Sequence, residues 1–205
     1  MRQRLLSLLL SVICSVGTAL PATVIDFESL NDGDTVTNQL AGLGVTLQNA
    51  IALTAGLSLN ELEFPPFSGT NVIGDNGGAI TITFSAFQSM VFGNFTYSAP
   101  LTLRAFDIAN TLLGSAFSSP GCTSNLELSG TPGCPANEQI TLLGVGDIAR
   151  VTITGASGGS SFTLDDLTFE PALIVEVPEP AMFPLALVAL AALALRQRRV
   201  SARRN

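Results

Sequence analysis

Through the middle of the chain, apolar residues alternate with Ser, Thr and Asn in short runs that Gly, Pro, Asn and Asp separate. In Ala79–Phe84, which reads A-I-T-I-T-F, the apolar side chains fall on one face of an extended strand and the threonines on the other. This is the pattern of a half-buried antiparallel strand. The runs that predict strands are Thr23–Glu28, Gly44–Asn49, Asn71–Ile73, Ala79–Phe84, Ser89–Tyr97, Leu101–Asp107, Thr111–Phe117, Thr123–Leu128, Glu138–Leu142, Ala149–Thr154 and Ser161–Phe169.

These runs predict the fold class of the segment 23–170, which we call the body. About ten short strands with turn signals between them are typical of an all-β, antiparallel β-sandwich, and we expect a jelly roll. The body shows no convincing apolar period of about 3.6 residues, the pattern of an amphipathic α-helix. Closure of such a sandwich should bring its first and last strands together.

The first residues have the pattern of an export signal. Two arginines precede the apolar stretch Leu5–Val16, and small residues follow it up to Ala22. A basic start, an apolar middle and small residues near a cleavage point are the three parts of a secretory signal peptide. We therefore predict a signal peptide over residues 1–22 and an exported body.

The end of the chain combines three features in order. The motif V-P-E-P stands at 177–180, an uncharged apolar run follows at Ala181–Leu195, and five arginines come after it. As a helix the apolar run is roughly 22 Å long, short of the ~30 Å hydrocarbon core but extended by snorkelling arginine stems. The arginines place the C-terminus in the cytoplasm by the positive-inside rule. We predict a linker with the motif at 171–180, a transmembrane helix at 181–195 and a basic cytoplasmic tail at 196–205.

This tail resembles the PEP-CTERM sorting signal of Gram-negative bacteria. The matching residues are Val177, Pro178, Glu179 and Pro180, the helix at 181–195, and Arg196, Arg198, Arg199, Arg203 and Arg204. The resemblance implies that an exosortase recognises the tail at the inner membrane and cuts near the motif. The protein would then stand at the cell surface or in the extracellular matrix. The alternative is a plain C-terminal membrane anchor.

Charge and composition limit the partners and the chemistry of the body. Residues 23–176 hold two arginines and fifteen acids, a net charge of about −13, and the chain has no lysine. Nucleic acid is excluded as a partner, because phosphate contacts need clustered basic residues. The absence of histidine excludes Ser-His-Asp and Cys-His catalytic sites. We predict no catalytic residues and no enzyme; the alternative is a secreted glycoside hydrolase or lyase that uses paired carboxylates.

Two cysteines remain once the signal peptide has been removed. Cys14 leaves with the signal peptide, so Cys122 and Cys134 are the pair of the exported chain. In an oxidising compartment these two should form a disulfide. In the chain-entropy model a bridge across a loop of this size is worth about 3 kcal/mol.

Six acidic residues near the two ends of the body form the best candidate for a ligand site. In a strand over Thr23–Glu28 the period of two puts Asp26 and Glu28 on one face, whereas Asp165 and Asp166 point to opposite faces unless the strand bulges. A calcium ion takes roughly six to eight oxygen ligands from carboxylates and carbonyls. We weigh a calcium site where the first and last strands meet against solvated strand and turn residues. The candidate ligands are Asp26, Glu28, Asp32, Asp34, Asp165 and Asp166.

Five segments of the body carry a second, looser resemblance: I-D-F-E-S-L at 25–30, G-L-G-V-T-L at 42–47, P-P-F-S-G-T-N-V at 65–72, G-G-A-I-T-I-T-F at 77–84 and F-T-L-D-D-L-T-F at 162–169. They resemble secreted jelly-roll domains that often precede PEP-CTERM tails, and these look like galactose-binding-like and carbohydrate-binding-module sandwiches. The resemblance implies a β-sandwich, in some cases with a structural calcium between the first and last strands. We expect a structural or adhesive role, with exopolysaccharide as the partner and calcium as a stabiliser.

Overall fold

Strands make up almost all the regular structure of residues 21–172, the part of the chain that the computed structural model describes. Every pairing between them is antiparallel, so the prediction of an all-β antiparallel body is confirmed. In chain order the elements are β1 (Thr23–Ile25), β2 (Thr35–Val36), the short 3-10 helix η1 (Ala41–Leu43), β3 (Val45–Gln48), β4 (Ala50–Thr54), β5 (Asn71–Asp75), β6 (Ile80–Tyr97), β7 (Thr102–Phe106), β8 (Leu112–Phe117), β9 (Glu138–Thr154) and β10 (Phe162–Pro171).

The predictions for the two ends of the chain fall mainly on other residues. The sorting motif 177–180, the membrane helix 181–195, the basic tail 196–205 and nearly all of the signal peptide lie outside the described residues. Between residues 21 and 172, no helix is long and apolar enough to span a membrane. The sorting signal and the anchor therefore stay predictions.

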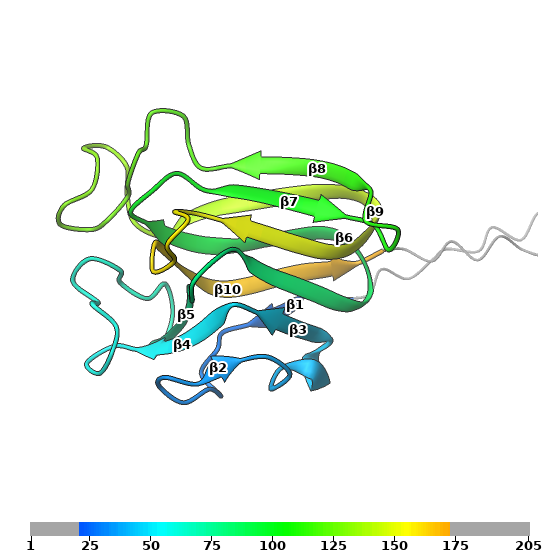
Figure 1. The fold of residues 1–205 in the computed structure, drawn as a ribbon, viewed down its shortest axis with the longest axis horizontal. Coiled ribbons are helices and arrows are strands. Elements are labelled where there is room, and N and C mark those ends of the chain that lie inside the picture. The colour runs from blue at the N-terminus through cyan, green and yellow to red at the C-terminus, as the bar shows by residue number, and fades with distance from the viewer. Residues whose placement is uncertain (1–20, 173–205) are drawn as a thin grey trace, which may run out of the picture. The chain divides into compact units, whose positions relative to one another are not determined.

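Two long strands, β6 and β9, run through both layers of the β-sandwich (Figure 1). The first part of β6 pairs with β3 and with the last part of β9, and its second part pairs with β10 and with the first part of β9. The register of β6 on β9 shifts between Thr83 and Met90, where both strands cross between layers. The hydrogen-bonded order is β2-β4-β5-β10-β6-β9-β7-β8, with β1 added on β10 and β3 on β6. The sheet thus folds over on itself.

The core lies between these two layers and follows the alternation read from the sequence. Ile80 and Ile82 of β6 are fully buried, and they join one cluster with apolar side chains from the strands of both layers. Across the layers the rings of Phe84 and Phe169 stand 5.2 Å apart between centroids. Burying apolar side chains of this size stabilises the fold by roughly 1.5–3 kcal/mol each.

Four of the predicted strands are joined in pairs. Ala79–Phe84 and Ser89–Tyr97 both belong to β6, and Glu138–Leu142 and Ala149–Thr154 both belong to β9. The residues between them follow no strict alternation, because they form the bend at which the two strands change layer. A bend with bulged pairing therefore looks like a turn in the sequence.

Two further differences have a local cause. The prediction of a strand at Thr123–Leu128 is wrong, since this segment is an irregular stretch that holds the buried side chain of Asn125 and ends in a turn. Conversely, β4 was not expected, because its sequence A-I-A-L-T is apolar on both faces and shows no alternation. Residues 123–128 and strand β4 both belong to the loops and the pocket described below.

Candidate functional site

The first and last strands lie side by side, as the closure of the sandwich predicts. β1 pairs with β10, with Thr23 opposite Phe169 and Ile25 opposite Leu167. Just beyond β1 the expected faces are also found, because the side chain of Phe27 is buried whereas Asp26 and Glu28 are exposed. The acidic residues from both ends of the body are therefore neighbours.

A bulge in β10 decides where the last two acids point. The register of β10 on β6 shifts between Asp165 and Thr168, and Asp166 takes a left-handed backbone conformation with φ of 46°. Such a bulge re-aims a side chain that strict alternation would send to the opposite face. As a result Asp165 and Asp166 both accept hydrogen bonds from Ser68, through its N–H and its hydroxyl respectively.

The carboxylates of Glu28 and Asp165 hold one segment of backbone. This segment ends the loop between β4 and β5, residues 55–70, which we call the β4–β5 loop. Asp165 Oδ2 accepts the N–H groups of Phe67 at 2.8 Å and Ser68 at 2.9 Å. Glu28 Oε1 accepts the N–H groups of Thr70 at 2.8 Å and of Asn71, the first residue of β5, at 2.7 Å. Two carboxylates from the ends of the body thus clamp the loop.

The clamp also sets the protonation of these two acids. Asp165 is 1 % exposed, and this burial raises its pKa to about 6 from an ordinary 3.8, although the N–H donors oppose the rise. For Glu28 the loss of solvation would raise the pKa, but the hydrogen bonds from Asn71 and Thr70 outweigh it and lower the pKa. The buried member of the clamp therefore titrates nearest to neutrality.

The remaining predicted ligands have separate partners. Asp26 accepts the N–H of Glu28, and Asp34 accepts the backbone and side-chain N–H groups of Asn31. Asp32 accepts the N–H of Thr54 at 2.9 Å and the hydroxyl of Ser58, and that hydroxyl lowers the pKa of Asp32. Within residues 21–172 no three metal-ligating side chains gather at one point. The structure thus brings Glu28, Asp165 and Asp166 to the end of the β4–β5 loop and Asp32 to Ser58 near its start, and it leaves Asp26 and Asp34 with local partners.

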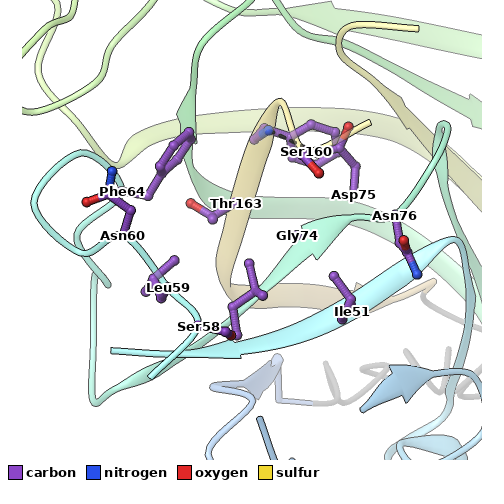
Figure 2. Close-up of a pocket in the computed structure, with 12 residues that line it drawn as sticks. Ile51, Ser58, Leu59, Asn60, Phe64, Gly74, Asp75, Asn76, Ser160 and Thr163 are labelled. Carbon is purple, nitrogen blue, oxygen red and sulfur yellow. Dashed lines mark hydrogen bonds between the residues drawn. The ribbon is translucent and has the colours of Figure 1, made fainter. Parts of the chain in front are cut away.

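A pocket of about 300 Å³ opens beside the β4–β5 loop, on the outer face of the layer that contains β4, β5 and β10 (Figure 2). Its floor crosses three strands, with Ile51 of β4 opposite Gly74 of β5 and Gly74 opposite Thr163 of β10. Asn60 and Asn76 stand at its two ends in this view. The lining residues are Ile51, Leu53, Ser58, Leu59, Asn60, Phe64, Gly74, Asp75, Asn76, Ser160, Phe162 and Thr163.

One acid, Asp75, is among the residues that line the pocket, and its carboxylate is already engaged. Oδ1 accepts the N–H groups of Ser161 at 2.6 Å and Phe162 at 3.0 Å, and Oδ2 accepts the hydroxyl of Ser161 at 2.8 Å. Asp75 is 2 % exposed. Its role is to tie the start of β10 to the end of β5, which fixes the pocket wall.

The predicted disulfide is confirmed in the loop between β8 and β9, residues 118–137, which we call the β8–β9 loop. Cys122 and Cys134 are bonded, with their Cα atoms 5.8 Å apart. Inside this loop the amide of Asn125 donates to the carbonyls of Phe95 and Pro135. Its side-chain oxygen accepts the N–H of Tyr97 at 2.6 Å. The loop is therefore held by one covalent bond and one buried amide.

Sequence reasoning missed the pocket and the loop clamp. The turn Asp75–Gly78 is readable as a glycine-rich turn, but only the pairing of β5 with β4 and β10 makes Gly74 the centre of a hollow. The signal that could have revealed it is the double-sided apolar sequence of β4, which requires a cover on the outer face.

Comparisons with known proteins give likeness in structure alone. No protein-family model matches the chain, and no curated protein matches it. The K2 cleaved adhesin domain of Lys-gingipain is similar with a TM-score of 0.45 and 12 % identity, over 73 % of this chain and 99 % of that chain. A DUF4465 family protein from Bacteroides caccae ATCC 43185 is similar with a TM-score of 0.45 and 13 % identity, over the same shares. Likeness at this level gives no argument for function.

Proposed function

We propose that this chain is an exported protein of the cell surface or extracellular matrix, sorted by a PEP-CTERM tail at 177–205 that an exosortase processes at the inner membrane. Its body, a jelly-roll β-sandwich, has a structural or adhesive role with exopolysaccharide as the partner. The sequence of the tail supports the sorting step, because motif, apolar run and arginines follow one another in the required order.

One observation in the body carries the adhesive role. The β4–β5 and β8–β9 loops lie at one end of the sandwich, and β10 ends at Pro171 at the opposite end (Figure 1). The loops are joined there, since Glu63 accepts the N–H groups of Leu128 and Ser129. Two joined loops at the end of the sandwich opposite to Pro171 suit the display of a binding surface.

The alternative of a carboxylate-dependent glycosidase receives less support from the pocket. Hydrolysis of a glycosidic bond needs two carboxyl groups that flank the bond, about 5–10 Å apart. Asp75 is the single acid among the residues that line this pocket, and its oxygens are engaged by Ser161 and Phe162. Binding without turnover therefore fits this site better.

We also propose that calcium stabilises the body beside the clamp. Glu28, Asp165 and Asp166 reach the same loop segment, and each of the first two has an oxygen that accepts a single hydrogen bond. The remaining oxygens would have to come from loop carbonyls. An ion that binds only the folded state adds about 2.7 kcal/mol at a hundredfold excess over its dissociation constant. Calcium should therefore raise the melting temperature relative to chelator, and equal midpoints would remove calcium from the proposal.

Mass spectrometry of surface material tests the sorting step. The mature protein should lack the arginine cluster, because processing near the motif removes everything that follows it. A surface form that keeps Arg203 and Arg204 as the dominant species would leave a permanent anchor instead. A polysaccharide array probed with the exported protein, with and without chelator, tests the adhesive role.

A further inference from the structure

Strand β4 inverts the usual distribution of side chains between core and surface. Its small residues Ala50 and Ala52 face the core and are at most 1 % exposed, whereas the large Ile51 and Leu53 face outward. The outer face of an antiparallel layer is normally polar. Large apolar side chains on this face indicate that something covers them.

The β4–β5 loop covers part of this outer face. Leu59 of the loop is 5 % exposed, and Val72 of β5, which lies opposite Leu53, is 1 % exposed. The hydrogen bonds from the backbone of Phe67 and Ser68 to Asp165 hold the loop over this covered part. The cover stops short of the row formed by Ile51, Gly74 and Thr163, and there the pocket opens.

Gly74 makes the uncovered part concave. A Cβ atom at this position would come within 2.9 Å of Leu53 Cδ1 and 3.5 Å of the carbonyl oxygen of Phe162. A side chain here would therefore project into the pocket and fill its centre. Any other residue at position 74 would fill this hollow with its side chain.

The charges near the hollow limit what can occupy it. The two cations of residues 21–172 are Arg104 and Arg150; neither lines the pocket, and Arg150 lies over the ring of Phe106 at 4.1 Å. A phosphate or carboxylate ligand would find no counter-charge. A cation would find only Asp75, whose oxygens are engaged by backbone and hydroxyl donors. The occupant should therefore be uncharged.

Apart from Asp75, the lining is divided into an apolar floor and amide ends. Ile51, Leu53 and Phe64 offer carbon surface, and the exposed amides of Asn60 and Asn76 offer donors and acceptors at the two ends (Figure 2). A side-chain amide both donates and accepts, as a hydroxyl does. A volume of about 300 Å³ is at the lower end of small-molecule sites. This combination matches a ring with an apolar face and hydroxyls on its rim.

We propose that the hollow over Gly74 binds one uncharged sugar unit, with the C–H face of the ring on Ile51 and Leu53 and its hydroxyls at the amides of Asn60 and Asn76. The inference rests on the proposed function in one respect, because the exopolysaccharide partner would be the source of that sugar. One part of this sheet face thus packs against the β4–β5 loop, and the open part forms the sugar site.

Nuclear magnetic resonance of the exported protein tests this site. Glucose, galactose, mannose and N-acetylglucosamine are each added to millimolar excess, and the backbone amide of Gly74 and the side-chain amides of Asn60 and Asn76 are followed. At least one sugar should shift these signals in a saturable way. Gly74→Val should weaken that binding by at least about tenfold. If none of the four sugars moves these signals, the site assignment is overturned.

Two further variants keep the result interpretable. Gly114→Val makes the same change in β8 of the other layer, where the nearest atom to an added Cβ is the carbonyl oxygen of Leu143 at 4.0 Å, and it should bind like the unaltered protein. If Gly74→Val does not fold, the double variant Asn60→Ala and Asn76→Ala, at two exposed positions, should lose the sugar instead. Sugar binding that survives the amide changes would overturn the site.

The polysaccharide array separates this inference from the proposed function. Polysaccharide binding by both the unaltered protein and Gly74→Val would refute the hollow as the site and keep the adhesive role. Shifts by a free sugar together with an array that stays negative would keep the hollow and refute the exopolysaccharide partner.

Discussion

Two long loops at one end of the sandwich are fastened in different ways. The β8–β9 loop closes on itself through a disulfide between residues 12 apart in the sequence. The β4–β5 loop is held by Glu28 and Asp165, which come from the two ends of the body and stand up to 98 residues from the backbone they bind. A local fastener fixes a loop before the fold is complete, whereas a distant one works only once the strands have closed. The second loop therefore depends on global folding.

The largest expected effect comes from removing the distant fastener. Asp165→Ala leaves the N–H groups of Phe67, Ser68 and Asp166 without their acceptor. Each buried, unpaired donor costs about 1–3 kcal/mol, so we expect urea unfolding at pH 5 to give a loss of about 4 kcal/mol. Asp166→Asn is the matched control and should lose less than about 1 kcal/mol, since Asn tolerates the left-handed backbone at this position and the Asp166 side chain meets one hydroxyl. Equal losses would show that the clamp does not depend on Asp165.

Removing the local fastener should cost less. Replacing Cys122 and Cys134 by Ser should lower the free energy of unfolding by about 3 kcal/mol, because the unfolded chain gains the freedom of a short ring. Asn125 should keep the loop attached to Tyr97 and Phe95 in this variant. Peptide mapping under non-reducing conditions checks the bond first, and free thiols in the exported protein would contradict it.

A buried hydroxyl tests how firmly the base of the same loop is held. Tyr97 is fully buried and donates to Glu138 Oε2 at 2.6 Å, while Oε1 of Glu138 accepts the N–H and hydroxyl of Ser119. Burial and this hydrogen bond raise the pKa of Tyr97 far above its ordinary value. Tyr97→Phe should lower stability by about 2 kcal/mol, as measured by chemical unfolding. An unchanged unfolding midpoint would mean that the hydrogen bonds of Ser119 to Glu138 hold the base of the loop without Tyr97.

The smallest effect is a pH dependence that belongs to the distant fastener. The pKa of Asp165 is about 6 in the folded protein against an ordinary 3.8, so the folded state favours the protonated form. Its contribution to stability is therefore full below about pH 3.8 and is lost as the pH rises through about 6. Between pH 5 and pH 7 the loss should be about 1 kcal/mol. The free energy of unfolding is measured against pH for the unaltered protein and for Asp165→Asn, and the difference between the two curves gives the contribution of Asp165. Parallel curves would exclude Asp165 as the source of the pH dependence.

The features of this fold differ in how far the sequence could predict them. The disulfide and the antiparallel strands were predictable, because alternation, turn residues and a cysteine pair can be read directly along the chain. The meeting of β1 with β10 was predictable because it follows from the closure of a β-sandwich. The clamp was only partly predictable: the acids were identified, but the bulge at Asp166 that directs two of them to one loop depends on pairing with β6. The hollow at Gly74 was not predictable, because three strands and a loop must assemble before it exists.

The long strands β6 and β9 have a consequence for the order of events during folding. Because each of these strands contributes to both layers, neither layer can form independently of the other. For the same reason, partial unfolding of one layer would break hydrogen bonds in the second. β1, the first strand to be synthesised, must also stay unpaired until β10 has been made. Contacts so distant in sequence slow the search for the native state to milliseconds or seconds. We therefore expect the body to fold as a single cooperative event that only the last strand can complete.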